Sequence, residues 1–375
     1  MKKIWIPAAT TFLMLLPQML AGRESSRTDR PDSLRIVLVG DMMGHGMQIA
    51  GAWRDGGDSS YRYLPVFQHV KDYISSAGLA VANLEVTLAG APYTGYPRFS
   101  SHSSFAVALQ DAGFDVLLTA NNHMLDRGKK GLERTVETLD SLGIYHTGAF
   151  RDSAAREKTH PLILTAAGFN IALLNYTYGT NGIKTESPNI VNRIDTAGMA
   201  ADLARTGTLH PDFIIVCIHW GEEYQNAEND TQRKLARFLA RNGCRLVAGS
   251  HPHVVQPFSL IATANGDSIP VIYSLGNFVS NQRDRYRNGG IALDVTLVKT
   301  DSVVHIASCA YEPFWVHRFH DGKVSVFRII PVNDCLRHPE KYKLDAESAR
   351  QLHQFSDDTR MLLHNLPFSG YYDSE

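Results

Sequence analysis

Two histidines in the stretch Gly249-Ser250-His251-Pro252-His253-Val254 have the residue type and the spacing for metal chemistry. They follow the apolar run 245–248, so they lie where a strand gives way to a loop, and a turn there can aim both imidazoles at one point. Neutral imidazole is the commonest metal ligand in proteins at neutral pH. Alone, the pair is also compatible with two loop histidines that are satisfied by hydrogen bonds, which is the commoner arrangement. Its interpretation therefore depends on the rest of the chain.

Four further strand-like runs end in polar side chains of the same chemical kind. Because sites in open α/β sheets form outside the carboxyl ends of the strands, we expect these side chains to lie close together. Each has an ordinary alternative, since Gly-Asp and Asn-Asn are common turns and a strand-end histidine can cap a carbonyl. The side chains are Asp41 after residues 36–39, Asn83 and Glu85 after 79–82, Asn121, Asn122, His123 and Asp126 after 115–119, and His219, Glu222 and Glu223 after 213–218.

The donor atoms in this set all suit the same kind of metal ion. Carboxylate oxygen, amide oxygen and imidazole nitrogen, with no thiolate, suit a divalent ion such as Mn, Fe or Zn. One carboxylate that bridges two ions, with an asparagine and three histidines around them, would make a two-metal centre. Such a centre generates hydroxide at neutral pH and clamps the attacking and leaving oxygens of a hydrolysis.

Alternating strand-like and helix-like stretches must position these groups. This alternation predicts an α/β domain whose sheet is covered on both faces. The pattern predicts helices over residues 63–76, 129–142, 196–205 and 231–241, and strands over 34–39, 79–82, 115–119, 161–164, 170–174, 213–218, 245–248 and 271–274. After about residue 285, strand-like runs at 291–299, 303–310 and 323–330 follow without helices, and they indicate an antiparallel set before a final helix over 345–363.

The composition restricts the class of protein. A hydrophobic content of 44% allows a well-buried core in a chain of 375 residues, so disorder is not expected. The net charge of −1 argues against a general nucleic-acid binder, which relies on neutralising phosphates. None of the four cysteines forms a C-x-x-C pair, so a zinc knuckle is not expected, whereas free thiols or a disulfide both remain open.

The first residues have the pattern of a secretory signal peptide. Met1-Lys2-Lys3 precedes an apolar run from Ile4 to Leu20, and Ala21-Gly22 supplies small residues for cleavage. The alternative is an uncleaved membrane anchor, but the run is short for a span and contains two prolines. We therefore expect a signal peptide over residues 1–22, a polar linker over 23–33, and export to the periplasm or cell surface.

The ordered motifs resemble the bacterial capsule synthesis CapA family, also called the poly-γ-glutamate capsule proteins, within the calcineurin-like metallophosphatase superfamily. The resemblance covers about residues 35–282 and implies a four-layer αββα sandwich. The domain would span residues 34–285, and residues 286–375 would complete it with strands and a helix. The matching stretches are Val39-Gly40-Asp41, Ala82-Asn83-Leu84-Glu85, Thr119 to His123 with Asp126 and Gly128, His219-Trp220-Gly221 with Glu223-Tyr224, Gly249 with His251 to Val254 and Gln256-Pro257, and Tyr273 to Phe278.

The resemblance also implies roles for single residues. Asp41 would be the first metal ligand and the candidate bridge, and His123 would protonate the leaving group or stabilise the charged transition state. The remaining metal ligands would be Glu85, Asn122, His219, His251 and His253. The residues expected to surround the ligands or hold substrate are Asn83, Glu223, Gln256 and Asn277, for which a structural turn or an exposed loop charge is the alternative.

Two positions depart from the superfamily pattern. Met43 stands where the opening Asp-x-His block has its histidine, and His45 lies two residues further on. Glu85 replaces an aspartate, which gives a longer arm. One metal position is therefore expected to be weaker or differently populated.

The resemblance implies an exported protein that acts in synthesis, release or export of an anionic polymer such as poly-γ-glutamate. The expected chemistry is metal-dependent hydrolysis of a phosphoester or amide bond, with two ions as cofactor. The expected partners are the polymer or a phosphorylated or γ-glutamyl substrate and a membrane-bound polymer synthase, but no nucleic acid. The alternative is a non-catalytic polymer-binding or synthase-accessory protein, because a fold does not fix a function.

Overall fold

The computed structural model describes residues 18–19, 33–367 and 369–371. Apart from Gln18, Met19 and Ser33, the signal peptide and linker expected over residues 1–33 lie outside the described residues. Within the described part of the chain, no helix combines the length and the apolar character that crossing a membrane requires. All four cysteines lie in this part and are free thiols.

One sheet contains the strands that precede Asp41, Glu85 and His123. Its order is β17-β16-β15-β2-β3-β4-β5, with the short strand β14 also beside β2. Strands β2 to β5 are parallel to one another, whereas β15 to β17 are antiparallel and extend the sheet from β2. The strands are β2 Ser33–Met42, β3 Leu79–Leu84, β4 Val116–Leu118, β5 Tyr145–Thr147, β14 Asn277–Val279, β15 Gly289–Thr300, β16 Val303–Asp321 and β17 Val324–Pro331.

The other large sheet contains the strands that precede the remaining histidines. Its order is β1-β7-β8-β10-β11-β13-β12, and β8, β10, β11 and β13 are parallel. Its strands are β1 Gln18–Met19, β7 Leu162–Ala166, β8 Phe169–Thr177, β10 Phe213–His219, β11 Leu246–Ser250, β12 Phe258–Ala262 and β13 Ser268–Ile272. A separate two-stranded sheet pairs β6 Ala149–Phe150 with β9 Ile190–Val191.

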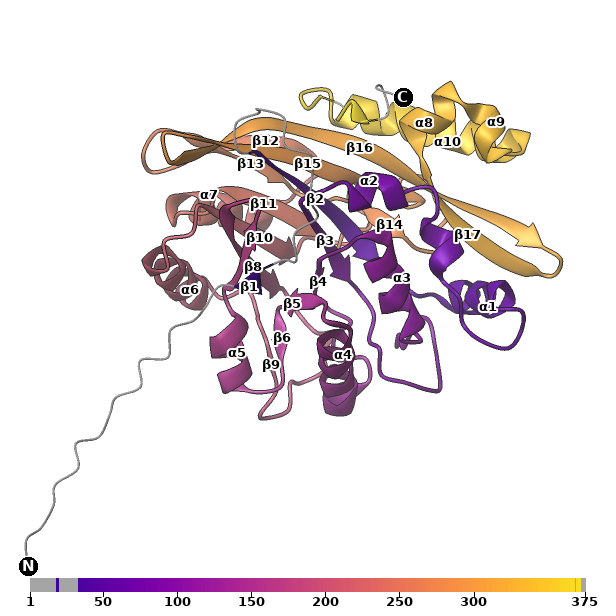
Figure 1. Cartoon of the computed structure of the whole chain (residues 1–375), viewed down its shortest axis with the longest axis horizontal. Helices are drawn as coiled ribbons and strands as arrows, with labels where there is room; N and C mark the ends of the chain where they lie inside the picture. The colour runs from indigo at the N-terminus through magenta and orange to yellow at the C-terminus, as the bar shows by residue number, and fades with distance from the viewer. Residues whose placement is uncertain (1–17, 20–32, 368, 372–375) are drawn as a thin grey trace, which may run out of the picture.

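Helices cover the outer faces of both large sheets (Figure 1). Four successive layers follow one another from left to right in this view. They are the helices α6 and α7, the sheet that contains β10, the sheet that contains β2, and the helices α1 to α3. The helices are α1 Gly46–Asp55, the 3-10 helix η1 Leu64–Phe67, α2 Lys71–Ser75, α3 Ser104–Ala112, α4 Gly128–Leu142, α5 Ser153–Thr159, α6 Thr196–Thr208, α7 Asp230–Arg241, α8 Val332–Arg337, α9 Pro339–Tyr342 and α10 Ala346–Leu362.

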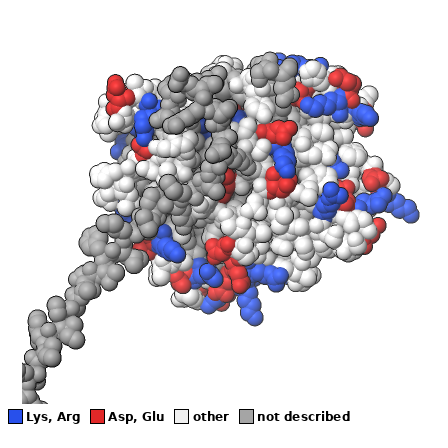
Figure 2. Space-filling view, viewed as in Figure 1, with Lys and Arg blue, Asp and Glu red and all other residues white. Residues whose placement is uncertain are grey.

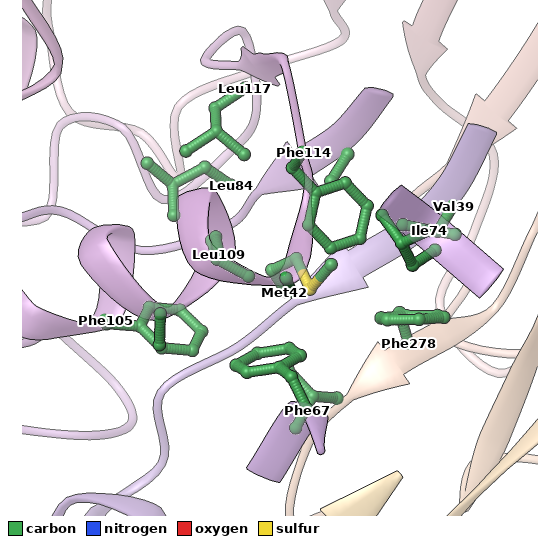
Figure 3. Close-up of a cluster of buried hydrophobic side chains, with 14 of the residues drawn as sticks. Val39, Met42, Phe67, Ile74, Leu84, Phe105, Leu109, Phe114, Leu117 and Phe278 are labelled. Carbon is green, nitrogen blue, oxygen red and sulfur yellow. The ribbon is translucent and has the colours of Figure 1, made fainter. Parts of the chain in front are cut away.

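The alternation of side chains along β2 shows why two cores form. Because successive residues of a strand point to opposite faces, Ile36 and Leu38 face the second sheet, whereas Val37 and Val39 face the helices. The outer core contains Phe67, Phe105 and Phe278, which come from η1, α3 and β14 (Figure 3). Strand β2 is thus buried on both faces, and this confirms the four-layer αββα sandwich.

The C-terminal part matches its expected form. β15 pairs antiparallel with β2 and β16, and α10 packs beside β16 with Leu352 and Phe355 buried. The side chain of Asp345 caps α10 by accepting a hydrogen bond from Ser348 N at 2.7 Å. The antiparallel strands and the terminal helix are therefore confirmed.

One expected helix is wrong in its length. Residues 63–76 form η1 and the short helix α2, separated by a turn, instead of one continuous helix. Pro65 is near the start of η1, where its missing N–H costs nothing. The elements that were not predicted are the helices α1, α3, α5, α8 and α9 and the strands β1, β5, β6, β9, β12 and β14.

The face shown in Figure 2 carries basic and acidic side chains interspersed with one another, without a large area of one sign. This distribution agrees with the nearly balanced net charge of the sequence.

Candidate metal centre

The polar strand ends from both sheets meet at one place. Asp41 is near the end of β2 and Glu85 follows β3, while His219 ends β10 and His251 follows β11. The loop after β4 supplies Asn122 and His123. The side chains expected along one edge of a sheet thus lie between the carboxyl ends of two facing sheets, and the six expected ligands and His123 are all buried.

One group of possible metal ligands consists of Asp41, Glu85 and His253. One donor atom from each lies within 4.8 Å of the donors of the other two. His253 Nδ1 lies 3.0 Å from Asp41 Oδ2 and 3.2 Å from Asn277 Oδ1. Because both neighbours are acceptors, Nδ1 carries a hydrogen, and Nε2, 3.8 Å from Glu85 Oε1, is left as the ligand nitrogen.

A second group consists of Glu85, His219 and His251, again with one donor atom each within 4.8 Å. His219 Nε2 lies 3.5 Å from Glu85 Oε1 and 2.9 Å from the side-chain oxygen of Asn122. The rings of His219 and His251 are 4.8 Å apart between centroids. Asn122 therefore joins this group as the expected amide ligand.

Glu85 belongs to both groups, whereas Asp41 belongs to one. Glu85 is completely buried, and neither carboxylate oxygen has a hydrogen-bond partner; His251 Nδ1 also has none. A buried charge without a partner is costly, so such groups normally pair or coordinate a metal. These three orphaned atoms show that the donor set fits divalent metal. Glu85, the member common to both groups, would therefore contact both ions when they are bound, whereas Asp41 would contact one.

The carboxyl groups of the centre respond to burial in different ways. Burial, followed by the neighbouring Asp41, raises the pKa of Glu85 well above its ordinary value. Burial also opposes ionisation of Asp41, but hydrogen bonds and charge interactions with His253, together with His219 and Asn83, hold the pKa of Asp41 below its ordinary value. Without a cation, the centre favours one carboxylate and one carboxylic acid.

The histidines of the second group are held neutral. Burial and the neighbouring His253 lower the pKa of His251 to about 3. Burial and the neighbouring His251 lower the pKa of His219 well below its ordinary value. Neutral imidazole is the form that binds metal, so neither ring has to lose a proton at neutral pH.

The loop after β11 holds an unusual backbone conformation. His251 and His253 have φ angles of 99° and 58°, in the left-handed region that residues with a Cβ avoid. Tyr224, with φ of 67°, donates its backbone N–H to the carbonyl of Pro252 between the two histidines at 2.8 Å. Strained backbone persists where the surroundings fix it, and here it turns both rings into the centre.

Hydrogen bonds from neighbouring residues orient the ligands. Asn83 Nδ2 donates to Asp41 Oδ1 at 2.8 Å, and Ser250 Oγ lies 2.9 Å from His219 Nδ1. Asn277 Nδ2 donates to the carbonyl of His253 at 3.2 Å. Asn83 and Asn277 therefore surround the ligands as the sequence suggests.

His123 stands beside the two groups and belongs to neither. Its Nδ1 lies 2.8 Å from Asp126 Oδ2, and its ring packs edge-on against Phe99 at 4.7 Å. The same Asp126 oxygen accepts a hydrogen bond from Phe99 N at 2.7 Å. Asp126 thus fixes the ring, and Nε2 remains for proton transfer.

Two expected substrate residues lie away from the ligands. Gln256 donates to the carbonyls of Gln225 and Ala227 at 2.9 and 3.0 Å, so it fastens the loop after β10. Glu223 is exposed, but its charge is close enough to contribute, after burial, to raising the pKa of Tyr178 to about 12. Glu223 is therefore near the entrance of the centre, and Gln256 has a structural role.

Met43 does not face the metal groups. Its side chain is buried in the apolar cluster beneath α1 to α3. His45 packs against Phe99 with ring centroids 5.2 Å apart and belongs to neither metal group of the described residues. The imidazole missing at position 43 is thus not replaced by His45.

Two tyrosines at the entrance were not singled out from the sequence. The ring of Tyr178 lies 4.5 Å from that of His251, and the ring of Tyr224 lies 6.0 Å from that of His253. Tyr178 directly follows β8, which runs in parallel beside β10. The expectation that polar side chains at strand ends form the site would also have identified Tyr178, if the predicted strand 170–174 had been extended to residue 177.

Comparisons with known proteins identify the family of the chain. Residues 35–282 match the family described as bacterial capsule synthesis protein PGA_cap. The chain is 28% identical over 294 residues to the PGA biosynthesis protein CapA of Bacillus subtilis (strain 168), covering 75% of this chain and 73% of that protein. It is 29% identical over 267 residues to the capsule biosynthesis protein CapA of Bacillus anthracis, covering 67% of this chain and 61% of that protein.

Solved structures give more distant matches. The calcineurin-like phosphoesterase YfkN from Bacillus subtilis has a TM-score of 0.46 at 13% identity, covering 90% of this chain and 99% of that chain. The 5'-nucleotidase from Candida albicans SC5314 has a TM-score of 0.43 at 13% identity, covering 89% of this chain and 59% of that chain.

Proposed function

Because the chain belongs to the PGA_cap family of bacterial capsule synthesis proteins, we propose that it is a metal-dependent hydrolase of an anionic cell-surface polymer. The bond cleaved is an amide in a polymer of the poly-γ-glutamate kind, or a phosphoester in a phosphorylated substrate. The names of the two CapA relatives support the polymer, since both refer to PGA or capsule biosynthesis. The hydrolysis is supported by the metal centre.

The observation that carries the proposal is the buried Glu85 carboxylate without hydrogen bonds, shared by two groups of ligands. We propose that Asp41, Glu85 and His253 hold one divalent ion, and that Glu85, Asn122, His219 and His251 hold a second. Manganese, iron or zinc suits these oxygen and nitrogen donors. When bound, such ions activate water at neutral pH and stabilise negative charge on the reacting group.

The surrounding residues supply orientation and a proton. Asn83, Ser250 and Asn277 keep the ligands turned toward the centre through the hydrogen bonds described above. His123, held through Nδ1 by Asp126, presents Nε2 to the leaving group and donates a proton to it when charged. Tyr178 and Tyr224 cover the histidine rings and limit the access of water.

The direct test combines metal analysis with hydrolysis assays on purified protein. We expect up to two equivalents of divalent metal per chain, and metal-dependent hydrolysis of p-nitrophenyl phosphate or of a γ-glutamyl peptide. Treatment with a chelator should abolish turnover, and adding the metal back should restore it. Protein without bound metal, whose activity is the same in Asp41→Asn and His253→Gln as in the wild type, would refute the proposal.

The buried Met43 favours one other function. With an apolar side chain in place of an imidazole ligand, the Asp41 group has fewer donors, and the same fold would then bind polymer or a membrane-bound synthase without turnover. Binding of polymer together with no hydrolysis of any tested substrate, even with metal bound, would support this accessory role over the enzyme.

The role of His123 predicts a dependence on the leaving group. Replacing His123 with asparagine should lower kcat by about 10²- to 10⁴-fold for a phenyl or alkyl phosphate, whose leaving oxygen needs a proton. The loss should be much smaller for p-nitrophenyl phosphate, because nitrophenolate leaves without protonation. Steady-state kinetics over a series of aryl phosphates would check this, and an equal loss for all leaving groups would contradict it.

We also propose that the chain acts outside the cytoplasm, which rests on the signal-peptide pattern of residues 1–22. Sequencing the amino terminus of the mature protein tests this. Cleavage near Gly22 is expected, and intact Met1 in protein from the soluble cytoplasm would exclude it.

A further inference from the structure

A cleft of about 610 Å³ is lined by Asp126, the residue that holds the ring of His123. It is built from two loops, residues 94–98 and 125–128, with Ile183 as a further contact. Nothing in the chemistry proposed above uses this space. Its position suggests a place for a part of the substrate that does not react.

Asp126 links the cleft to the candidate proton donor His123. Asp126, which lines it, binds His123 Nδ1 at 2.8 Å and the backbone N–H of Phe99, next to Arg98, at 2.7 Å. On the opposite side, Asn122 Nδ2 donates to Asn181 Oδ1 at 3.2 Å, two residues before Ile183. Both walls are therefore held by residues of the centre, so a ligand in the cleft would be positioned relative to it.

The charges in the cleft favour an anion. Arg98 and Arg127 both line it, and within the described part of the chain neither guanidinium forms a salt bridge. Arg127 uses Nη1 to donate to Pro92 O and Thr94 Oγ1 at 3.2 Å each. The acidic residue of the lining, Asp126, has its Oδ2 occupied by His123 and Phe99. Two arginines without carboxylate partners thus face one cleft.

The amino end of α4 adds to this positive potential. Gly128, its first residue, lines the cleft, and the first turn contains no acidic side chain. A helix start carries a partial positive charge, which an acidic residue in the first turn usually balances. No acidic residue offsets this partial charge in the first turn of α4. The side chains that would contact an anion are still the two arginines.

We propose that Arg98 and Arg127 form an anion subsite that binds a carboxylate or phosphate of the substrate next to the reacting bond. The proposal rests on the proposed function and refines it, because it assigns the substrate to the class of chains with repeated negative charges. A guanidinium binds carboxylate or phosphate through paired N–H groups, a geometry that the point charge of a lysine ammonium lacks. A small monoester reaches the metal centre but leaves the subsite empty.

Binding of labelled oligomers, measured by fluorescence anisotropy in the metal-loaded protein, tests the subsite. The two probes are a short oligo-γ-glutamate and a short polyphosphate, which distinguish a carboxylate from a phosphate ligand. Each of Arg98→Gln and Arg127→Gln should weaken binding of the preferred probe roughly fivefold, which is the range of partly exposed ion pairs. Added salt should weaken binding more in the wild type than in the double variant.

Matched variants separate charge from structure. Arg98 makes no side-chain hydrogen bond in the described residues and is exposed, so its replacement should not unfold the protein. Arg127→Lys keeps the charge and should recover most of the binding that Arg127→Gln loses. Lys130→Gln, on the same helix but outside the cleft, should bind like the wild type.

Kinetics give the second readout. Wherever an oligomer is cleaved, the double variant should raise its KM much more than it lowers kcat, and should raise the KM of p-nitrophenyl phosphate less. Unchanged oligomer binding in the double variant would overturn the subsite even if hydrolysis is found. Arginine-dependent binding without hydrolysis would instead refute the proposed enzyme and leave the subsite standing.

Discussion

Replacing Glu85 with glutamine is expected to release both metal ions and to lower kcat by at least about 10³-fold. Glu85 is the residue common to both ligand groups, and a neutral amide cannot bridge two cations. Losing several kcal/mol of transition-state stabilisation corresponds to a rate loss of this size. Metal content per chain and steady-state kinetics on p-nitrophenyl phosphate provide the measurement.

The same substitution should not harm the metal-free fold. Both oxygens of Glu85 are buried without a hydrogen bond, so the metal-free wild type already contains a buried polar group that lowers its stability. Glutamine has the same size as glutamate and therefore fits the same space. Metal-free Glu85→Gln should therefore unfold at the same temperature as the metal-free wild type or higher. Unlike the wild type, it should gain no stability from added metal.

Variants of ligands that belong to only one donor group test whether the effect is specific to Glu85. Asp41→Asn and His251→Gln each alter one group, so each should lose about one ion. Glu222→Gln, on an exposed loop, should keep both. If Asp41→Asn releases both ions while Glu85→Gln retains one, Asp41 is the bridge and the assignment of Glu85 is wrong.

Replacing Gly40 with alanine is expected to destabilise the protein by about 3 kcal/mol, which lowers Tm by roughly 4 °C in a chain of this size. A Cβ at position 40 would collide with the carbonyl oxygen of Gly276, which also accepts the N–H of Asp41 at 3.0 Å. Pairing of β2 with β3 shifts register between Val39 and Asp41, so this glycine lies where Asp41 is aimed. Metal affinity should also fall, by about 10- to 100-fold, because Asp41 is displaced.

Gly207→Ala is the matched control for this prediction. Gly207 lies within α6, and a Cβ there meets nothing within 4 Å. Alanine in a helix is more stable than glycine by roughly 0.5–1 kcal/mol, so Tm should stay equal or rise slightly. Thermal unfolding of both variants, with and without metal, checks the contrast. Equal Tm values for both variants would show that β14 can move away from β2 at no cost.

The sequence predicts which side chains gather at the candidate centre better than it predicts their arrangement. Asp41, His219 and the histidine pair each follow an apolar strand, and this local pattern is visible in one dimension. The membership of Glu85 in both donor groups depends on how two sheets face each other, which no strand pattern contains. The burial of the Met43 side chain also depends on packing, because it lies in the apolar core beneath the helix layer.

The weaker predictions fall where local signals are short. Residues 63–76 have helical spacing, but the fold divides them into η1 and α2. The Arg98 loop has no periodic pattern, so the cleft that it forms with Arg127 emerges only when residues 94–98 lie against 125–128. Contacts between distant loops are the part of this molecule that one sequence does not reveal.

The pairing of β2 with β14 and β15 has a consequence for when the centre can form during synthesis. Asp41 is made early, but its neighbours His253 and Asn277, and the strand β15 that flanks β2, come more than 200 residues later. A partly made chain therefore holds only scattered ligands, and metal binding is coupled to folding. A bound ion would therefore be selected where the last strands are added, and the compartment in which the chain finishes folding would decide which metal it keeps.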